Sequence, residues 1–521
     1  MLTYRDNKLL YRTNNPNERI ILKNIGGRWD SRYNAVSLPP IFSSICSVER
    51  VLGRVAYHAS TAHYMEQYGF HIKPANLENV NATLYPYQKE AVDFLVNSPH
   101  HGSILSLSPG LGKTLTSIAA AVAMGAKKVL VVSPLTLMST WIAEIYKWAR
   151  IHAVNCYGGV PDGHGWFVTN YDTVVKYADQ YIDQCYDVLI IDESILVKNR
   201  KTKRAQTVLA LSNSADKVWL LSGAPVSRHA DDLFMQLRIV APTYFTSYWR
   251  FVNQYCLTHS NVWGTKVVGT NPNINFAHEF KDLMFVRNQK QVLPDLPDML
   301  FQRYEVELTG RQAQLYTEMR DMFIMELLED RVVAGTRLAQ IVRLQQIVSC
   351  PETFENGLVS PKYDLLETLI SNAELPLPAI VWVNFKQTAD TLCARLARRF
   401  SGLSVAHIHG DVPAEERTRI IRGFQNGECD ILILSLGTGK YGLTLTNAQG
   451  VVYYDKTFDG DAYLQSLARV QRIGLSHVPI VCTIQAKNSV DTLIEFNLAG
   501  KMQSIHQISN NDLATLMRSL T

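Results

Sequence analysis

The sequence lacks any apolar run that approaches the roughly 20 residues of a membrane-spanning helix. Its polar beginning, MLTYRDNKLLYR, also lacks the apolar core of a secretory signal. The eight cysteines form no CxxC pair and do not have the histidine spacing of a zinc module, so neither a disulfide framework nor such a module is predicted. We therefore expect reduced core thiols in a protein that stays in the cytosol and has no membrane partner.

The net charge is small, at +4, and identifies no partner by itself, because many ordinary proteins carry as much. Its distribution is uneven: residues 1–54 hold nine Lys or Arg and four Asp or Glu, a surplus of +5. Hydrophobic residues make up 47% of the chain and charged residues 19%, which is typical of a globular protein with little disorder. The length of 521 residues suggests about three domains, and the basic N-terminus is a candidate DNA-contacting module.

Short β-rich apolar runs alternate with helical patterns from about Tyr85 onward, as in parallel sheets with crossover helices. The alternation occurs twice. The first series of expected strands is 103–107, 128–133, 187–192 and 217–222, and the second begins at Ala379, Ser404, Asp430, Gly450 and Pro479. The predicted fold class is α/β, with two tandem parallel-sheet lobes, long helices inserted between them over residues 310–348, and a small N-terminal α+β domain. The expected domains are 1–80, 81–300, 301–360 and 361–521.

The segment SPGLGKT follows a predicted strand and opens a helical run. Its glycines let backbone N–H groups approach phosphate oxygens, Lys113 supplies a cation to the outer phosphates, and the Thr114 hydroxyl can hold Mg²⁺. A strict P-loop has glycine where Leu107 stands, and the segment alone could be a glycine-rich turn of an unrelated sheet. The predicted phosphate-binding residues are Gly110, Leu111, Gly112, Lys113 and Thr114.

The segment DVLIIDES places two carboxylates, Asp192 and Glu193, at the end of a predicted buried strand. Strand ends of parallel sheets face the nucleotide, so Asp192 is expected to bind Mg²⁺ and Glu193 to orient and polarise the attacking water. An acidic pair after an apolar strand is often only a solvated strand end. The P-loop upstream favours the catalytic interpretation.

With these two motifs in place, the chain resembles the Swi/Snf-type branch of the superfamily 2 helicases from Leu84 to about Leu498. The resemblance implies two RecA-like lobes that close on one ATP with Mg²⁺, and this superfamily relaxes the position of Leu107. Further motifs stand in family order: LYPYQKEAVDFL, VVSPLTLMSTWIAEIYKW, FVTNYDTV, LLSGAP, IHGDVPAEERTRIIRGFQNG and YGLTLTNA. Carried over residue by residue, they imply an adenine-reading Gln88, nucleotide contact at Gly442, and DNA-backbone contacts at Thr169 and Tyr171.

The segment QSLARVQRIG resembles the family's motif VI and holds two arginines three residues apart. On a predicted helix this spacing puts Arg469 and Arg472 on one face. The resemblance implies that Arg472 is the arginine finger that neutralises charge on the transferring phosphoryl group, supported by Arg469. Without the family spacing, a solvated basic helix face would be the usual explanation.

Four positions depart from the family pattern. Ile195 replaces the histidine of the DExH box, and Ala468, Gln471 and Leu475 replace polar residues of motif VI. The hydrolytic set, Lys113, Asp192, Glu193 and Arg472, is complete. We therefore expect ATPase activity, while the coupling of hydrolysis to movement is in doubt.

The N-terminal segment ILKNIGGRWDSRYNAVSLP is similar to the small HARP domain of annealing helicases, and the span from FVNQYC to FVRNQKQVLPDLPD resembles the same group. This similarity implies DNA contact by Arg28, Trp29 and Arg32, although Trp29 could equally be a core residue of an unrelated β unit. The compact chain also resembles the branch-migration helicases of tailed phages. The expected location is thus a bacterial or phage-infected host cytoplasm.

The basic run KNRKTKR directly follows the acidic box, where the family has a loop that touches the DNA backbone. A nuclear localisation signal is the alternative, but we favour phosphate contact. The residues expected to make it are Lys198, Arg200, Lys201 and Lys203.

Three functions compete at this point. The favoured one is an ATP-dependent motor, expected to be monomeric, that drives branch migration, fork regression or annealing on duplex, forked or four-way-junction DNA. The second is a duplex translocase that remodels or strips protein–DNA complexes. The third is a nucleotide-gated DNA scaffold without hydrolysis, which the intact Glu193 and Arg472 disfavour.

Overall fold

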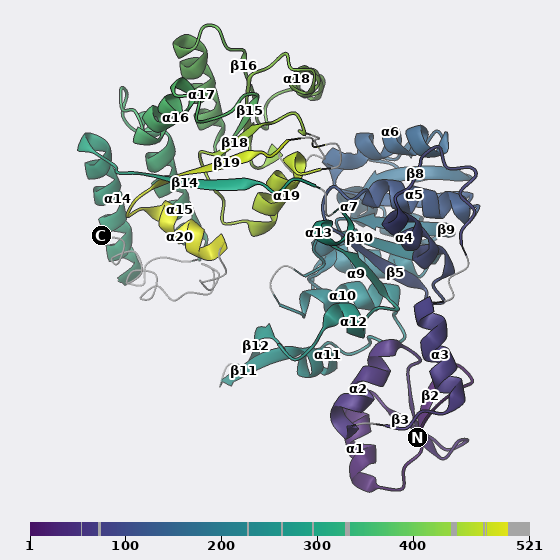
Figure 1. Ribbon diagram of the computed structural model, residues 1–521. Helices are drawn as coiled ribbons and strands as arrows, with labels where there is room; N and C mark the ends of the chain where they lie inside the picture. The colour runs from purple at the N-terminus through teal and green to yellow at the C-terminus, as the bar shows by residue number, and fades with distance from the viewer. Residues whose placement is uncertain are drawn as a thin grey trace. The chain divides into compact units, whose positions relative to one another are not determined.

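The computed structural model divides into two compact units, Met1–Pro294 and Asp295–Thr521. It describes residues 1–53, 55–70, 74–226, 229–261, 264–293, 296–328, 334–438, 445–472, 475 and 477–498. Figure 1 shows a parallel sheet flanked by helices in each unit, and a small separate sheet near the N-terminus. The described fold is therefore α/β with two RecA-like sheets, as the alternating pattern predicts.

The N-terminal domain is a four-stranded antiparallel sheet, in the order β1-β2-β4-β3, with three helices. Its elements are β1 (Leu2–Arg5), β2 (Lys8–Tyr11), α1 (Pro16–Asn24), β3 (Arg28–Asp30), β4 (Ala35–Leu38), α2 (Phe42–Leu52) and α3 (Ala59–Phe70). Alternate residues of the strands pack on α1 and α2 around the buried Leu9, Leu22 and Val36. The Phe42 N–H donates to Asp282 at 2.9 Å and Arg50 pairs with Glu279, so this domain is joined to the first lobe by buried polar contacts.

The first lobe contains a seven-stranded parallel sheet in the order β13-β5-β10-β9-β6-β8-β7. Its strands are β5 (Gly102–Leu107), β6 (Lys128–Ser133), β7 (Val154–Asn155), β8 (Gly165–Asn170), β9 (Tyr186–Asp192), β10 (Ala215–Ser222) and β13 (Met284–Arg287). Alternate residues of every strand except the exposed edge strand β7 enter two different hydrophobic clusters, so both faces of the sheet are buried. This double burial is why the central strands appear in the sequence as continuous apolar runs.

Helices cover both faces of this sheet (Figure 1). They are α4 (Pro86–Asn97), α5 (Lys113–Ala123), η1 (Leu135–Leu137), α6 (Met138–Ala149), α7 (Tyr171–Lys176), α8 (Ala178–Ile182), η2 (Ser194–Val197), α9 (Lys203–Ser212), α10 (Asp232–Val240), α11 (Tyr248–Tyr255), α12 (Phe276–Glu279) and α13 (Gln289–Val292). Residues of α4, α5 and α6 pack on one face, and those of α9, α10 and α11 on the other. The sheet therefore lies between two layers of helices, which fix the positions of its strand ends.

A two-stranded antiparallel ribbon extends from α11 and pairs with no other described strand. Its strands are β11 (Cys256–Asn261) and β12 (Gly264–Thr270), and Figure 1 shows it projecting from the body of the first unit. At its base the Asn271 N–H donates to the Tyr255 carbonyl and Thr270 Oγ1 accepts from the Ala230 N–H. The ribbon is thus anchored at one end and exposed along most of its length.

The second unit has a six-stranded parallel sheet in the order β14-β19-β18-β15-β17-β16. Its strands are β14 (Leu300–Val306), β15 (Ala379–Val383), β16 (Val405–Ile408), β17 (Ile431–Ser435), β18 (Gly450–Tyr453) and β19 (Ile480–Ala486). The helices are α14 (Gly310–Leu328), α15 (Ala334–Ser349), η3 (Pro351–Thr353), α16 (Pro361–Ser371), α17 (Lys386–Arg399), α18 (Ala414–Gln425), α19 (Gly460–Val470) and α20 (Val490–Leu498). The helices α14 and α15 share a hydrophobic cluster with α20, so the long helices predicted between the lobes pack on the second sheet's unit.

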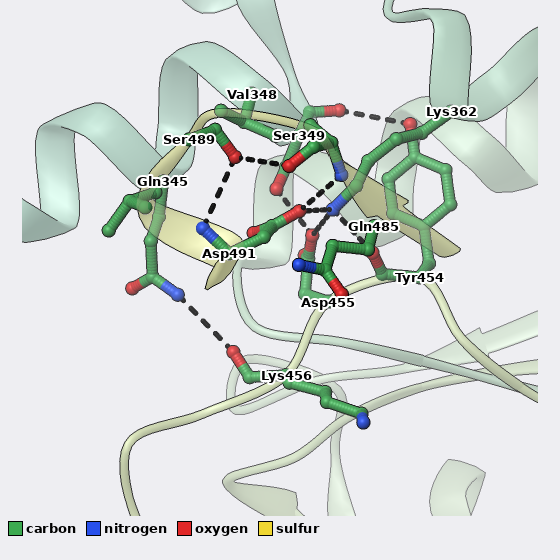
Figure 2. A network of polar contacts seen from close by, with 12 residues as sticks. Gln345, Val348, Ser349, Lys362, Tyr454, Asp455, Lys456, Gln485, Ser489 and Asp491 are labelled. Atoms are coloured by element: carbon green, nitrogen blue, oxygen red, sulfur yellow. Dashed lines mark hydrogen bonds and ion pairs between the residues drawn. The ribbon is translucent and has the colours of Figure 1, made fainter. Parts of the chain in front are cut away.

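A buried ion cluster ties this unit together, as Figure 2 shows. Lys362 is 1% exposed, and its Nζ lies 2.8 Å from Asp491 Oδ2, 3.6 Å from Asp455 Oδ1 and 2.8 Å from the Tyr454 carbonyl. Asp455 also accepts hydrogen bonds from Ser349 and from the Asn384 N–H. Burial raises the pKa of Asp455, and the lysine opposes that rise. The cluster therefore joins α15, α16 and α20 to the segment that leads into α19.

Nine expected strands are confirmed, with ends that differ by up to two residues. The unexpected strands include β8, β13, β14 and the ribbon.

The cysteines are free, but Cys185 is exposed, which corrects the expectation that all eight are core thiols. Among the described residues, no helix is both long and apolar enough to cross a membrane.

Candidate ATP hydrolysis site

The phosphate loop lies between β5 and α5, and its glycines are required by geometry. Gly110 and Gly112 have φ of 87° and 79°, in the left-handed region. A Cβ at Gly112 would lie only 2.5 Å from Nε2 of Gln88. Both this clash and the left-handed backbone exclude a larger residue at Gly112. Gly112 is the N-cap of α5 without a side-chain cap, which leaves the first backbone N–H groups of the helix for an anion.

Gln88 supports this loop from α4. Its Nε2 donates to the Leu111 carbonyl at 3.1 Å, and its Oε1 accepts from the Tyr85 N–H at 3.0 Å. The Tyr87 hydroxyl donates to the same Leu111 carbonyl. An amide has a second donor and a second acceptor position, which is what an adenine edge requires. The side chain is 2% exposed, however, so the contacts assign it to positioning the loop, and adenine recognition stays a prediction.

Lys113, the first residue of α5, points its ammonium group toward the loop. Its Nζ donates to the Leu107 carbonyl at 3.0 Å, at the end of β5. A Cβ placed on Gly223 would be 3.6 Å from this Nζ and 3.1 Å from Pro109 Cγ. The LLSGAP segment after β10 therefore packs directly on the phosphate loop, and glycine there leaves space for the lysine.

Asp192 and Glu193 stand at the end of β9, beside these residues in the same sheet. Asp192 is 6% exposed and accepts from Trp141 Nε1 at 2.8 Å and from the Glu193 N–H at 3.0 Å. Glu193 has φ of 53° and ψ of 54°, a left-handed conformation that is unusual for a residue with a side chain. Trp141 lies on α6, and the sequence analysis did not single it out although it stands within a quoted motif.

Tyr171 and Thr169 support the acidic pair from behind. The Tyr171 hydroxyl donates to the Asp192 carbonyl at 2.5 Å, and burial raises the pKa of this tyrosine well above 10, so it stays a neutral donor. Thr169 is fully buried and accepts from the Tyr181 hydroxyl. Both side chains lie too deep to reach DNA in this structure, which corrects the expected backbone contacts. We reassign them to positioning the strand ends.

Gln236 connects the acidic box to the LLSGAP segment. Its Oε1 accepts from Ser194 Oγ at 2.7 Å, and its Nε2 donates to the Pro225 carbonyl at 2.6 Å. The side chain is fully buried on α10. One buried amide thus joins the two segments. A buried glutamine 42 positions beyond Ser194 carries no sequence signal that would reveal this pairing.

The two motif VI arginines lie in the second unit, in different local structures. Arg469 is in the last turn of α19 and is 8% exposed. The helix ends at Val470 and Gln471 is its C-cap, so Arg472 lies beyond the helix. The expectation that one helix face carries both arginines is therefore wrong. The role of Arg472 as arginine finger stays a prediction. The predicted nucleotide contact at Gly442 lies outside the described residues.

The positions that depart from the family pattern are accommodated locally. Ile195 lies in the short helix η2 and its carbonyl accepts from the Lys198 N–H. Gln471 donates to the Pro297 carbonyl at 3.1 Å, and Leu475 is 7% exposed. At these motif VI positions, Leu475 is therefore packed in the interior, and Gln471 bonds to the segment that begins the second unit.

These residues form a set suited to a nucleoside triphosphate with a divalent cation. The set combines a glycine cradle at a helix start after β5, a lysine, and a buried carboxylate with a second carboxylate at the end of β9; only β10 lies between these two strands. Lys113 and Thr114 would hold the phosphates and Mg²⁺ with Asp192, and Glu193 would orient water. Such an ion neutralises charge on the phosphate oxygens.

Comparison with known families decides the wider classification. Residues 87–353 match the family profile described as "SNF2-related domain", and residues 361–474 match "Helicase conserved C-terminal domain". The chain belongs to the SNF2-related family. This places it in the Swi/Snf-type branch of the superfamily 2 helicases, and the helicase C-terminal match follows the SNF2-related match along the chain.

Curated relatives of this SNF2-related chain differ in their described roles. It is 26% identical over 438 residues to SWI/SNF-related matrix-associated actin-dependent regulator of chromatin subfamily A-like protein 1 of Xenopus tropicalis, covering 82% of the chain and 45% of the relative. It is 25% identical to DNA annealing helicase and endonuclease ZRANB3 of Bos taurus, covering 82% and 40%. It is also 25% identical to nuclear protein STH1/NPS1 of Saccharomyces cerevisiae, covering 84% and 36%. The chain spans less than half the length of these relatives.

A solved structure is similar to the SNF2-related chain at a low score. It is the Sulfolobus solfataricus SWI2/SNF2 ATPase core in complex with dsDNA, with a TM-score of 0.40, 22% identity, and coverage of 86% of this chain and 97% of that one.

The basic loop after the acidic box lies at the surface of the first unit. Lys201 and Lys203 are exposed, Arg200 lies with its guanidinium 4.4 Å from the ring centre of Tyr248, and Lys198 pairs with Asp232 at 3.4 Å. The exposed cations can reach a phosphate backbone, whereas Lys198 is partly engaged within the lobe.

In the N-terminal domain, Trp29 is 45% exposed on β3, so the alternative that it is a core residue is wrong. The Arg19 guanidinium lies 3.9 Å from its ring centre. Arg28 precedes it on the same strand and is exposed on the opposite face of the sheet, and Arg32 is exposed while paired with Asp30 at 3.4 Å. The three predicted residues thus lie on the surface, together with an arginine that the sequence analysis did not name.

Proposed function

We propose that this SNF2-related ATPase uses ATP hydrolysis to move along duplex DNA and to remodel branched DNA by branch migration, fork regression or annealing. The observation that carries the branched-DNA role is the exposed Trp29 with the Arg19 guanidinium against its ring. Arg28 and Arg32 are also exposed, on the same strand and in the turn that follows it. The motor itself acts on duplex DNA of any sequence, and the chain acts as a monomer in this proposal.

The ATP site supports the motor. Lys113 follows β5, and Asp192 and Glu193 stand at the end of β9, which only β10 separates from β5 in the sheet. Trp141 and Tyr171 hold the acidic pair in place. Positioning of this kind is what phosphoryl transfer requires from a protein, because the protein contributes orientation and charge rather than covalent chemistry. Gln236 offers a route by which the state of the acidic box reaches the LLSGAP segment.

The N-terminal surface supports contact with unpaired or splayed bases. Trp29 is nearly half exposed, and its indole ring can stack on a base of any identity. Arg19 at the ring and the exposed Arg28 and Arg32 can supply phosphate contacts. A surface of this composition binds best where duplex and unpaired strands meet, as at a fork or junction.

The ribbon β11–β12 supports the same proposal. The chain contains no Asp or Glu from Leu233 to His278, a stretch that includes the whole ribbon. The ribbon exposes His259, Lys266 and the apolar side chains of Leu257 and Val268. A two-stranded ribbon fits a DNA groove, and exposed apolar side chains can lie against unstacked bases.

Remodelling of protein–DNA complexes is the second candidate. The printed name of the chromatin regulator among the relatives favours it. The same motor would serve both activities, since a fold and its motor do not fix the cargo. The name of the annealing helicase ZRANB3 and the exposed N-terminal surface favour the branched-DNA role.

The test is a comparison of four-way-junction migration and duplex-stimulated ATPase in a Trp29→Ala, Arg32→Ala double variant. Base stacking is worth about 1–3 kcal/mol, so junction migration should fall roughly 5- to 150-fold while duplex-stimulated ATPase stays within about twofold. Arg12→Ala is the matched control, because Arg12 is also an exposed arginine of this domain.

Equal loss of both activities would mark the surface as a general DNA grip. Unchanged junction migration would remove the functional meaning of the N-terminal surface and favour the protein–DNA remodelling role.

A further inference from the structure

Three potential metal ligands lie together on the second unit, in elements that hold none of the residues assigned to nucleotide. His407 is on β16, which is an outer strand of the sheet, and His409 directly follows that strand. The residue between them, Ile408, is 1% exposed, so the alternation of an extended strand puts both imidazoles on the opposite face. The third residue, Asp390, is in α17, which packs against β16.

The three side chains converge on one point. His407 Nε2 lies 3.1 Å from Asp390 Oδ1, and His409 Nε2 lies 3.0 Å from the same oxygen. One donor atom from each residue lies within 4.8 Å of the other two, and the imidazole centres are 5.2 Å apart. Zinc–nitrogen and zinc–oxygen bonds are about 2.0–2.2 Å, so two ligands of a tetrahedral ion lie about 3.3 Å apart. The observed separations therefore need only small shifts to surround one ion.

The ligand chemistry selects the class of ion. Two imidazoles and a carboxylate suit Zn²⁺ and neighbouring first-row divalent ions, whereas Mg²⁺ prefers oxygen ligands alone. The Asp390 side chain is 52% exposed, which leaves a fourth position open to water. Among the residues that the structure describes, no other three His, Cys, Asp or Glu side chains converge in this way.

We propose that Asp390, His407 and His409 form a binding site for Zn²⁺ or a similar transition-metal ion. The ion would link β16 and the turn at His409–Val412 to α17. This turn leads into α18 and is further held by Arg417, whose guanidinium donates to the Gly410 and Val412 carbonyls. The site thus clips an outer strand to its covering helix.

A cluster of hydrogen bonds without metal is the competing explanation. Each neutral imidazole could donate one N–H to Asp390, and the Asp411 N–H donates to His409 Nδ1 at 3.3 Å. Metal ligation through Nε2 moves the histidine proton to Nδ1 and replaces that long contact. The two explanations make opposite predictions for Asp390→Asn, because an asparagine oxygen still accepts hydrogen bonds but is a poor ligand for zinc.

The experiment is a Zn²⁺ titration of the full chain, freed of metal by chelation and held without nucleotide in excess Mg²⁺. We expect one tight site per chain and a rise of a few degrees in the melting temperature, since an ion that binds only the folded state stabilises it. His407→Ala, His409→Ala and Asp390→Asn should each weaken binding at least about tenfold. The control is His164→Ala, which removes an exposed histidine of the first unit.

Cobalt gives an independent readout. Co²⁺ bound to nitrogen and oxygen ligands in tetrahedral geometry absorbs visible light, and this band should be lost in His409→Ala and kept in His164→Ala. Tight binding that persists in Asp390→Asn and in the two alanine variants would overturn the proposal. Absence of any Zn²⁺ effect on the intact chain would leave the hydrogen-bonded cluster as the explanation and overturn it equally.

Discussion

Glu193 shows how individual side chains hold the catalytic end of β9 in an unusual conformation. A non-glycine residue in the left-handed region costs about 1 kcal/mol or more, so the surrounding contacts must favour it. Trp141 bonds the Asp192 carboxylate and Tyr171 bonds the Asp192 carbonyl. These contacts come from two separate helices. Because of this turn, the Glu193 side chain does not follow the alternation of faces along β9.

Lys113→Ala and Glu193→Gln should each reduce ATP hydrolysis by a hundredfold or more. The first removes charge compensation at the phosphates, and the second removes the carboxylate that acts on water, which is typically worth about 10²–10⁴-fold. Steady-state phosphate release with duplex DNA measures the loss, and DNA binding is the control. Near-normal DNA-stimulated turnover in either variant would disprove the site.

Trp141→Phe should lower ATP hydrolysis about ten- to hundredfold and raise the Mg²⁺ concentration required for half-maximal rate. The indole N–H fixes the carboxylate that is assigned to the ion, and loss of such an outer contact costs this much in metal sites. Trp148→Phe is the matched control, since Trp148 lies on the same helix and bonds Glu144. An unchanged Mg²⁺ requirement in Trp141→Phe would contradict the positioning role.

At the scale of elements, the central strands could be predicted from the sequence because strands buried on both faces are continuous apolar runs. The strands β8, β13 and β14 were missed; β14, for example, is largely exposed and mixes polar with apolar residues. The end of α19 was also missed, since nothing in QSLARVQRIG marks Val470 as the last helical residue. Burial of Thr169 and the reach of Gln236 depend on contacts between distant segments, which local patterns do not contain.

The candidate site was predictable to the same extent. The P-loop and the acidic pair are each formed by consecutive residues, so a local sequence pattern reveals them. The side chains that hold these motifs in place are distant in sequence: Trp141 lies 51 positions from Asp192, and Gln236 lies 42 positions from Ser194. Exposure of Trp29 likewise follows from which face of a small sheet is covered, and the sequence left both possibilities open.

Lys362→Met tests the buried ion cluster of the second unit. Removal of one partner from a buried pair costs about 3–5 kcal/mol, so the melting temperature of this unit should fall by roughly 10 °C. Lys487→Met is the control, because Lys487 forms an exposed pair with Glu307. Calorimetry of the full chain separates this transition from that of the first unit.

The pH dependence of the same variant has a defined sign. Burial already raises the pKa of Asp455, and loss of Lys362 raises it further. A carboxyl with a raised folded-state pKa stabilises the fold below its unfolded pKa and loses that contribution as pH rises through the folded pKa. The deficit of Lys362→Met should therefore shrink toward acidic pH. A deficit that grows on acidification would contradict the charge argument.

At the scale of the whole molecule, one chain combines an ATP site, two RecA-like lobes and an N-terminal domain with an exposed basic and aromatic surface. That domain is joined to the first lobe through Asp282 and Glu279, which follow the acid-free stretch of the ribbon. Both proposed DNA-branch elements are therefore attached to the lobe that carries Lys113 and Glu193. This arrangement favours a motor that acts on the branch it contacts.

The most direct test of the account is ATP-dependent conversion of a labelled four-way junction into duplex products by the intact chain, with Glu193→Gln as the matched inactive variant. The account predicts conversion by the wild-type chain, none without ATP, and a loss of at least a hundredfold in Glu193→Gln with junction binding retained. The branched-DNA role would be contradicted if the wild-type chain hydrolysed ATP normally on plain duplex but converted neither junctions nor forks.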